Sequence, residues 1–275
     1  MKFDTSNIVF SRPDNRRNII LPSYLTQKLS NYIGIHIGDG YLNINKRKNS
    51  KSVDYNIEYT GHEVDEIEFH EEYIVPLIRG LFNIEPYLRI GNKTTVRTYF
   101  RSKAILTFLK EVIGIPKGNK RDIEVPPIII NSNLKMKKSF LKGLFDTEGS
   151  MVFKKRYREK HYYPTISIGS QSKNLIKVVK VFLDEIGIKS CVCYNLRNYR
   201  NGKVNFEHQI DISGRKNLDI WMDKIGFNSS KHLTKYDVWK KFGFCPPNTN
   251  IIERRKILKG VVDINSYYGP VAQPG

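Results

Sequence analysis

Two acidic residues occupy matching places in a nonapeptide that the chain contains twice. The first copy, Tyr32–Gly40, reads YIGIHIGDG, and the second copy, Leu141–Gly149, reads LKGLFDTEG. An offset of 109 residues superposes Asp39 on Glu148. Because glycine commonly follows a helix end, each acid is expected at a helix C-terminus, where the helix dipole disfavours a carboxylate. A divalent metal ion would supply the missing positive charge, and oxygen ligands beside a phosphate favour Mg²⁺.

The same nonapeptide places small residues four positions apart. Gly34 and Gly38 in the first copy correspond to Gly143 and Thr147 in the second. Residues at this spacing share one helix face, so two such helices can pack with their backbones close together. That packing would bring the two acids to one point. A single Asp-Gly step would be read as an ordinary turn, but two matched copies favour a site.

The repeat extends well beyond the nonapeptide. The offset of 109 also superposes Lys46 on Lys155, and Ile57 on Ile166. Hydrophobic periodicity predicts the order helix, strand, strand, helix, strand, strand, helix in each half, with Ser23 as the cap of the first helix. The expected elements are helix 23–38, strands 41–47 and 54–60, helix 65–81 with Pro76 ending or kinking it, strands 87–90 and 95–101, and helix 103–113, followed in the second half by helix 134–147, strands 150–157 and 162–168, helix 172–186, strands 190–198 and 203–212, helix 215–225, and a further helix near 232–242.

This order suggests five segments. Residues 1–22 form an N-terminal extension, 23–115 the first repeat, and 134–242 the second repeat. Residues 116–133, which contain three prolines, are the expected linker. Residues 243–275 form a C-terminal extension whose end, from Tyr267 onward, lacks periodicity and is expected to be irregular and outside the fold.

Charge limits the class of partner. The 275 residues include 46 Lys+Arg against 27 Asp+Glu, a formal net charge of +19, while a hydrophobic content of 40% can support a sizeable core. A polyanion such as DNA or RNA is the expected partner of so basic a chain. A membrane surface is disfavoured because the basic residues are spread over the whole chain and no lipidation motif is present.

Cysteine usage and hydropathy indicate an intracellular, cytoplasmic protein. The three cysteines, Cys191, Cys193 and Cys245, are an odd number and show no zinc-site spacing. They are expected to be buried or half-buried thiols in a reducing compartment. No signal peptide and no apolar run near 18 residues is visible in the sequence.

The two nonapeptides resemble the LAGLIDADG motif of homing endonucleases. The flanking order over roughly residues 20–240 is similar to that family's αββαββα repeat, and the motif variants resemble archaeal, freestanding members with two repeats in one chain. The resemblance implies an α+β fold: two pseudo-symmetric αββαββα repeats form a DNA-binding saddle, with the two motif helices at the central interface.

The resemblance also implies a chemistry. Asp39 and Glu148 would bind the catalytic metals, two or three Mg²⁺ (or Mn²⁺) ions, together with the backbone carbonyls of Gly38 and Thr147. Each acid would serve cleavage of one DNA strand and leave short 3′ overhangs. The two halves differ at the strand positions expected to face DNA, so the target is expected to be long and not palindromic. Both acids lie in one chain, so a monomer should suffice.

Other site residues follow from the family pattern. A lysine downstream of the last helix of each repeat is Lys120 in the first repeat and Lys231 in the second, with Lys235 as the alternative to Lys231. Gln171 resembles a residue that orders active-site water, and its counterpart is His62. Any of these lysines could equally be a solvated loop charge.

The sixth motif position departs from the family pattern in one repeat. It is Asp146 in the second repeat but Ile37 in the first. A helix-capping or packing role is therefore lost in the first repeat, although this position is not a metal ligand. The neighbouring His36 is expected to be a core or interface histidine.

Outward positions on the expected strands supply amides and arginines, which can read major-groove base edges, and basic clusters that can hold phosphates. Any one of them could instead belong to a solvated polar face. The positions expected to face base edges are Asn43, Asn45, Asn56, Glu58, Arg97, Arg101, Thr165, Ser167, Asn205, Glu207 and Gln209. The positions expected to hold phosphates are Lys46, Arg47, Lys48, Lys154, Lys155, Arg156, Arg197 and Arg200.

The function expected from these features is site-specific, metal-dependent cleavage of double-stranded DNA. The alternatives on the same fold are an RNA maturase, which would bind intron RNA, or a regulator that binds nucleic acid without cleaving it. Both motif acids are present, which favours the nuclease. An intein is disfavoured because the sequence starts at Met1 without a splicing Cys or Ser and lacks a terminal His-Asn. No His-Asn-His constellation or GIY/YIG strand pair is found.

Overall fold

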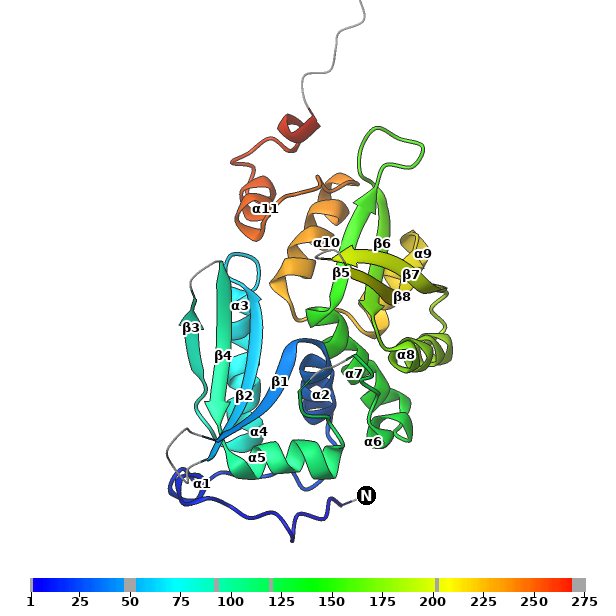
Figure 1. The fold of residues 1–275 in the computed structure, drawn as a ribbon. Helices are drawn as coiled ribbons and strands as arrows, with labels where there is room; N and C mark the ends of the chain where they lie inside the picture. Colours follow the sequence, from blue (N-terminus) through cyan, green and yellow to red (C-terminus); the bar gives the residue numbers. More distant parts are fainter. Residues whose placement is uncertain (1, 47–52, 92–93, 119–120, 201–202, 269–275) are drawn as a thin grey trace, which may run out of the picture.

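Two four-stranded antiparallel sheets flank a central pair of helices (Figure 1). The structure is a computed structural model and describes residues 2–46, 53–91, 94–118, 121–200 and 203–268. Both sheets have the same strand order, with the fourth strand of the repeat between the second and the third. The predicted α+β class and its two matching repeats are therefore confirmed.

The first repeat is built around the sheet β1-β2-β4-β3. Its helices pack against one face of this sheet and leave the other face open (Figure 1). Its elements are α2 (Gln27–Asp39), β1 (Gly40–Lys46), β2 (Val53–His62), α3 (Ile67–Phe69), the π-helical turn η1 (His70–Ile74), α4 (Val75–Phe82), β3 (Tyr87–Ile90), β4 (Thr95–Arg101), α5 (Lys103–Thr107) and the π-helical turn η2 (Phe108–Ile113).

The second repeat is built around the sheet β5-β6-β8-β7. Its elements are α7 (Leu134–Thr147), β5 (Gly149–Lys154), β6 (Tyr163–Ser170), α8 (Lys173–Ile186), β7 (Cys191–Arg200), β8 (Lys203–Ser213), α9 (Arg215–Lys224) and α10 (Ser230–Phe242). The remaining elements are α1 (Arg12–Arg16), α6 (Pro127–Ile130), α11 (Ile251–Leu258) and the 3₁₀ turn η3 (Ile264–Tyr268).

The structure corrects the start of one predicted helix and the regularity of two others, one of which, helix 103–113, consists of α5 and the π-helical turn η2. The first begins at Gln27, because the Thr26 hydroxyl accepts a hydrogen bond from the Leu29 N–H and caps it; Ser23 does not. The predicted helix 65–81 is split into α3, η1 and α4, with Pro76 in the first turn of α4. Proline lacks an N–H and clashes with the preceding turn, so the regular helical ladder is interrupted just before it.

The C-terminal extension is more ordered than the sequence suggests. It contains α11, and Tyr267, expected outside the fold, packs against the hydrophobic core. The Tyr268 hydroxyl lies 3.3 Å from the His161 backbone nitrogen, which donates to it. No helix in the described residues combines the length and the apolar character needed to cross a membrane.

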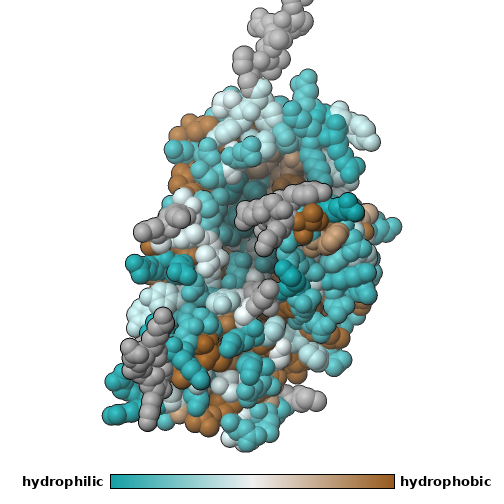
Figure 2. All heavy atoms as spheres, in the orientation of Figure 1, coloured by the Kyte–Doolittle hydropathy of each residue, from teal (hydrophilic) through white to brown (hydrophobic). Residues whose placement is uncertain are grey.

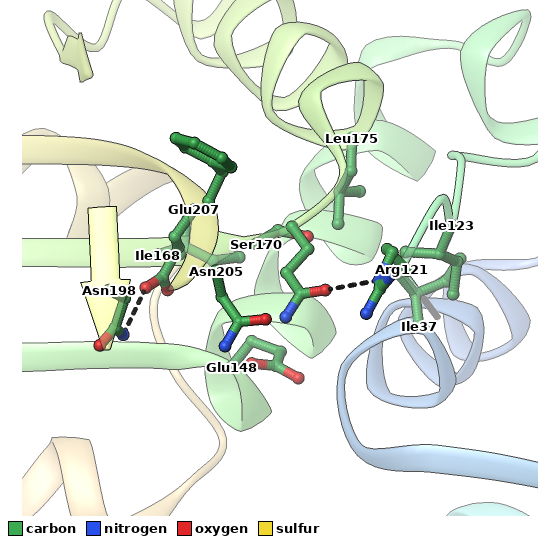
Figure 3. Close-up of a pocket in the computed structure, with 13 residues that line it drawn as sticks. Ile37, Arg121, Ile123, Glu148, Ile168, Ser170, Leu175, Asn198, Asn205 and Glu207 are labelled. Atoms are coloured by element: carbon green, nitrogen blue, oxygen red, sulfur yellow. Dashed lines mark hydrogen bonds between the residues drawn. The ribbon is translucent and has the colours of Figure 1, made fainter. Parts of the chain in front are cut away.

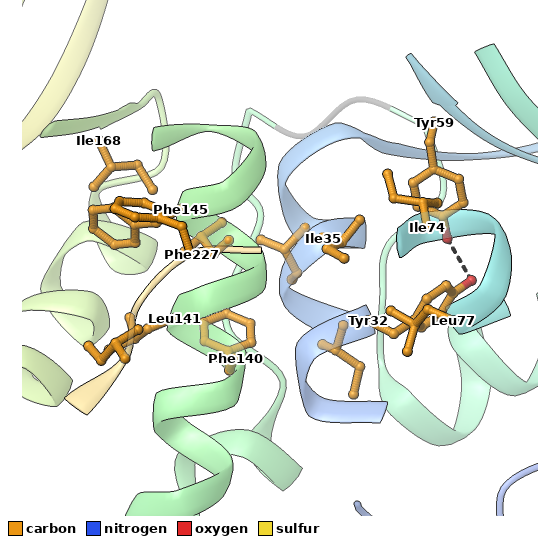
Figure 4. Close-up of a cluster of buried hydrophobic side chains, with 14 of the residues drawn as sticks. Tyr32, Ile35, Tyr59, Ile74, Leu77, Phe140, Leu141, Phe145, Ile168 and Phe227 are labelled. Atoms are coloured by element: carbon orange, nitrogen blue, oxygen red, sulfur yellow. Dashed lines mark hydrogen bonds between the residues drawn. The ribbon is translucent and has the colours of Figure 1, made fainter. Parts of the chain in front are cut away.

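Helices α2 and α7 lie side by side at the centre of the molecule (Figure 4). A Cβ atom added to Gly34 would overlap the carbonyl oxygen of Phe140, and one added to Gly143 would overlap that of Asn31. The predicted close approach of the two backbones is thus confirmed. Large side chains fill the outer flanks of the pair, with Tyr32 on the first-repeat side and Phe145 on the second-repeat side.

Candidate functional site

The two motif acids lie where the ends of α2 and α7 meet. Asp39 is the last residue of α2, and Glu148 caps the C-terminus of α7, as the sequence predicts. A Cβ added to Gly38 would overlap the hydroxyl of Thr147 and lie 3.2 Å from Cγ of Glu148. The side chain of Glu148 therefore lies against the residue next to Asp39. Asp39 is half-buried and Glu148 is exposed, so solvent reaches both residues.

The glycines after the acids are required for close packing rather than for a left-handed turn. Gly40 has φ of −72°, in the extended region, and neither Gly40 nor Gly149 has positive φ. A Cβ on Gly40 would overlap the ring of His36, and one on Gly149 would overlap the carbonyl oxygen of Phe145. The chain passes directly from helix to strand, which holds each acid at a rigid junction.

The donor groups at this junction suit a hard divalent cation. They are the two carboxylates and the backbone carbonyls of Gly38 and Thr147, which belong to the last turns of their helices. No group of three or more His, Cys, Asp or Glu side chains that could hold a metal occurs among the described residues. Such a site would need water and phosphate oxygens to complete the coordination, which is how proteins usually bind Mg²⁺.

A cavity of about 350 Å³ opens beside Glu148 (Figure 3). Gln171, proposed from the sequence as a water-ordering residue, lines this cavity, and its Oε1 accepts a hydrogen bond of 3.2 Å from Nε of Arg121. Arg121 comes from the segment after the first repeat, so it joins the two repeats on the Glu148 side. Lys120, its neighbour in sequence, lies outside the described residues.

Lys231, in α10 of the second repeat, reaches across to the first repeat. Its ammonium nitrogen is 2.6 Å from Oε1 of Glu66, and Oε2 of Glu66 accepts a 2.6 Å hydrogen bond from the His62 N–H. The strand register makes the surroundings of His62 equivalent to the cavity beside Glu148. Tyr59 pairs with Gly40 in the first repeat, as Ile168 pairs with Gly149 in the second. His62, the last residue of β2, and Gln171, the residue after β6, each lie three residues beyond the residue that pairs with the glycine of their motif. Glu66 joins the His62 N–H to Lys231 of α10, and Gln171 is joined directly to Arg121 from the segment after the first repeat.

The alternative lysine, Lys235, points into the core. Its ammonium group donates a 3.0 Å hydrogen bond to the carbonyl of Met151. Burial lowers the pKa of Lys235 to about 8, and the nearby charges of Arg254 and Lys231 act in the same direction. Lys231 rather than Lys235 is thus the lysine that reaches the first repeat.

The two residues at the sixth motif position differ in role, as predicted. Asp146 is fully buried and accepts hydrogen bonds from the N–H groups of Asn228 (2.8 Å) and Ser229 (2.9 Å), so it fixes the segment that leads into α10. Burial raises the pKa of Asp146 to about 7, and these donors oppose that effect. Ile37 is buried beside the cavity, and His36, a core histidine as expected, lies 2.8 Å from the Tyr59 hydroxyl.

Most of the proposed DNA-facing residues are accessible. Figure 2 shows the face seen in Figure 1, which is mostly hydrophilic and hollowed near its middle. Two of these residues, Arg97 and Glu58, form an ion pair with each other. The predicted residues that are at least partly exposed in the structure are Asn43, Asn45, Lys46, Asn56, Glu58, Arg97, Arg101, Lys154, Lys155, Arg156, Ser167, Arg197, Asn205, Glu207 and Gln209.

Two predictions about exposure are wrong. Thr165 has 0% exposure, and its hydroxyl lies 3.4 Å from that of Ser213 on the neighbouring strand. Cys191 and Cys193 are exposed rather than buried, since β7 is an edge strand, and only Cys245 is buried. Arg47, Lys48 and the side chain of Arg200 lie outside the described residues.

The sequence did not identify Arg121 or Glu66 as site residues. Arg121 could have been found, because it adjoins the lysine of the family pattern. Glu66 had no local signal, since its partner Lys231 is 165 residues away.

Comparison with protein families gives a match in the second repeat. Residues 135–226, about a third of the chain, match the LAGLIDADG-like domain. The chain is 27% identical over 221 residues to glutamine–fructose-6-phosphate aminotransferase (isomerizing) of Methanocaldococcus jannaschii, covering 78% of this chain and 18% of that protein. It is 29% identical over 157 residues to the tRNA-splicing ligase RtcB of Methanopyrus kandleri, covering 55% and 15% respectively. The chain thus spans less than a fifth of the length of these relatives.

Solved structures extend the similarity to both repeats. The complex of the homing endonuclease I-DmoI with DNA and Mn has a TM-score of 0.51 and 21% identity, covering 73% of this chain and 97% of that chain. A lysine-to-alanine mutant of I-SmaMI has a TM-score of 0.54 and 16% identity, covering 91% and 100%. This chain therefore has the fold of the LAGLIDADG homing endonucleases, and its residues 135–226 form a LAGLIDADG-like domain.

Proposed function

We propose that this protein is a site-specific endonuclease that hydrolyses phosphodiester bonds in both strands of DNA. The observation that carries the proposal is the contact of Gly38 with Thr147 and Glu148, which joins the two acid-bearing helix ends. The target is a long, non-palindromic sequence, and cleavage leaves short 3′ overhangs. One chain contains both acids, so it acts as a monomer, on DNA in the cytoplasm.

The relatives support a shared module rather than a shared metabolic activity. An aminotransferase and an RNA ligase catalyse unrelated reactions. The part of each relative that matches this chain is less than a fifth of that relative's own length. Their named activities do not transfer to this chain. The complexes of I-DmoI with DNA and Mn or Ca support DNA as the partner and a divalent ion as the cofactor.

Different residues of the chain would bind the metal and position water. Asp39 and Glu148, with the carbonyls of Gly38 and Thr147, would hold Mg²⁺ (or Mn²⁺), two or three ions in all. When bound, the metal supplies positive charge to the phosphate and makes a water molecule more acidic. Lys231, oriented by Glu66, and Gln171, oriented by Arg121, position water and neutralise charge beside each acid. Lys120 is the proposed lysine of the Glu148 side.

A cleavage assay with acid variants tests the proposal. The substrate is supercoiled DNA that carries the uninterrupted insertion locus, with Mg²⁺ and with EDTA. The native protein should linearise it only with Mg²⁺, whereas Asp39→Asn and Glu148→Gln should at most nick it. Lys216→Ala, an exposed change on α9, serves as the control and should cleave like the native protein.

Binding without any cutting would contradict nuclease activity. Intron RNA would then be the next ligand to test, because an RNA maturase or a silent regulator would use the same basic face. Equal double-strand cleavage by both acid variants would contradict the two-carboxylate site instead.

A further inference from the structure

Another pocket lies between the N-terminal halves of the two motif helices, toward the ends opposite the motif acids. It has a volume of about 300 Å³ and is enclosed by α2, α7, η1 and the end of α9. Lys28, at the start of α2, precedes Asp39 by eleven residues, or roughly 16 Å along the helix. Among the described residues no acid lines this pocket, which we call the lysine pocket. The five cations that line it are Lys28, Lys135, Lys138, Lys142 and Lys224.

The charges of these five lysines are not balanced within the pocket. None of them forms an ion pair with another residue in the described parts of the chain. Lys224 donates to a neutral acceptor, the carbonyl of Ile186, at 2.9 Å. Asp146 interacts with Lys142, but it is fully buried and does not line the pocket. A pocket lined by charges of one sign concentrates ions of the opposite sign, so this one attracts anions.

The lysine pocket breaks the symmetry of the two motif helices. The offset of 109 residues pairs Leu29 with Lys138 and Ile33 with Lys142. Both apolar residues have 0% exposure, whereas both lysines are half-buried. Two half-buried cations in place of a close-packed apolar pair lower stability unless an anion offsets their lost hydration. These two positions of the second repeat are therefore suited to binding rather than to packing.

The lining of the pocket also includes a polar residue held by hydrogen bonds. Asn31, the counterpart of Phe140 at the same offset, lines the pocket and is 4% exposed. Its amide nitrogen donates to the carbonyl of Ser139 (3.1 Å), and its amide oxygen accepts from the hydroxyl of Tyr73 (2.9 Å). Phe140 instead packs edge-on against Phe182, with ring centroids 6.3 Å apart. One flank of the helix pair is thus apolar and closed, and the other presents a preorganised polar surface.

We propose that the lysine pocket binds an anion with two or more phosphate groups, at a site separate from the motif acids. A lysine ammonium is a compact charge with three donors that commonly binds phosphate, and five of them around one pocket can contact several phosphates at once. The Gln27 amide, which also lines the pocket, is a further donor. A free oligophosphate and a nucleic-acid strand both offer this chemistry.

Calorimetric titration with inorganic triphosphate at low salt tests the proposal. We expect the native protein to bind it saturably, and the double variant Lys28→Gln with Lys138→Gln, the pocket variant, to bind at least about tenfold more weakly. The matched control, Lys256→Gln with Lys259→Gln, removes the same charge from exposed positions outside the pocket and should lose less than about threefold. Thermal unfolding of all three proteins checks that each remains folded.

Equal losses of affinity in the two double variants would overturn the proposal, because net charge alone would then explain the attraction. The absence of saturable binding to the native protein would also overturn it. Acetylation of lysines followed by mass spectrometry locates the bound anion in the native protein. Triphosphate should protect Lys138 and Lys142 but not Lys256, and equal protection of all three would contradict the assigned place.

Titration with a short single-stranded RNA distinguishes the two sources of phosphate. A larger loss of affinity for RNA than for triphosphate in the pocket variant would assign the pocket to a nucleic-acid strand, and the reverse would assign it to a free oligophosphate. Both results support a phosphate site. The pocket variant should cleave DNA like the native protein, because neither lysine lies beside the motif acids. The phosphate site and the proposed nuclease function can therefore fail independently of each other.

Discussion

The ammonium nitrogen of Lys231 lies 2.6 Å from the carboxylate of Glu66, which binds the second repeat to the first. Two further ion pairs, Arg254 with Asp65 and Arg255 with Glu68, attach α11 to the same stretch of the first repeat. These contacts lie outside the packed motif helices and restrict how the two sheets can move relative to each other. The two repeats are therefore joined at two separate places, the motif helices and this group of ion pairs.

Breaking the pair between Lys231 and Glu66 should destabilise the protein. Their side chains are 22% and 12% exposed, so the partner that remains keeps a poorly solvated charge. Glu66→Gln and Lys231→Met should each lower the free energy of unfolding by about 1–3 kcal/mol, with the double variant losing less than the sum. Urea denaturation measures all three. Glu85→Gln, in the exposed pair with Arg79, is the control and should change it by less than about 1 kcal/mol. Additive losses would show that the pair is not coupled.

Adding one methyl group at the central helix interface should be costly. Gly34→Ala would push a Cβ into the backbone of Phe140, which cannot move aside as a side chain can. We expect a loss of about 1–3 kcal/mol or more in thermal or chemical unfolding. Gly80→Ala in α4 is the matched control, because a Cβ there meets nothing within 4 Å. It should stabilise the protein by about 0.5–1 kcal/mol, and equal effects at the two sites would contradict the close packing.

Asp146 should give the stability a distinctive pH dependence. Its pKa is about 7 in the folded protein, raised by burial from an ordinary 3.8. Between about pH 4 and pH 7 the folded state holds more protons at this carboxyl than the unfolded state, so this group lowers stability as pH rises. Lys142, Tyr73 and His232 are the titratable groups that interact with it.

Asp146→Asn removes this titration and isolates its contribution. His70, whose pKa burial lowers to about 4, makes stability rise with pH below its ordinary value of 6.5, and does so equally in both proteins. The difference in unfolding free energy between the native protein and Asp146→Asn should therefore change steadily from about pH 4 to about pH 7, to the disadvantage of the native protein. Urea titrations across that range would detect it, and a constant difference would refute the raised pKa.

Binding to DNA should be strongly salt-dependent. With a net charge of +19, six to ten phosphate contacts would weaken binding roughly a thousandfold or more between about 50 and 200 mM salt. Lys154→Ala removes an exposed charge of β5 and should reduce the slope of log Kd against log salt by about 1. Lys180→Ala, paired with Asp184 on α8, should leave the slope unchanged. Fluorescence anisotropy across a salt series would distinguish them, and equal slopes would argue against phosphate contact at Lys154.

The sequence alone determined the repeat, the order of elements and the place of the acids. Helix 134–147 and strands 87–90 and 95–101 were predicted with the limits that the structure shows. These features are local: apolar periodicity, caps and turn residues specify them within a few residues, and duplication repeats the signal. The close approach of the motif helices also followed from Gly34 and Gly143, because small residues at helical spacing leave few other ways to pack.

Only the tertiary structure decided which distant side chains meet. Glu66 and Lys231 are 165 residues apart, and no pattern within either repeat links them. Thr165 is fully buried opposite Ser213, although strand alternation predicts that it faces outward. Strands β7 and β8 remain paired beyond the end of β6, and β7 contains a bulge at Asn195. Pairing length and bulge geometry arise from long-range contacts, and such contacts leave no periodic trace in the chain.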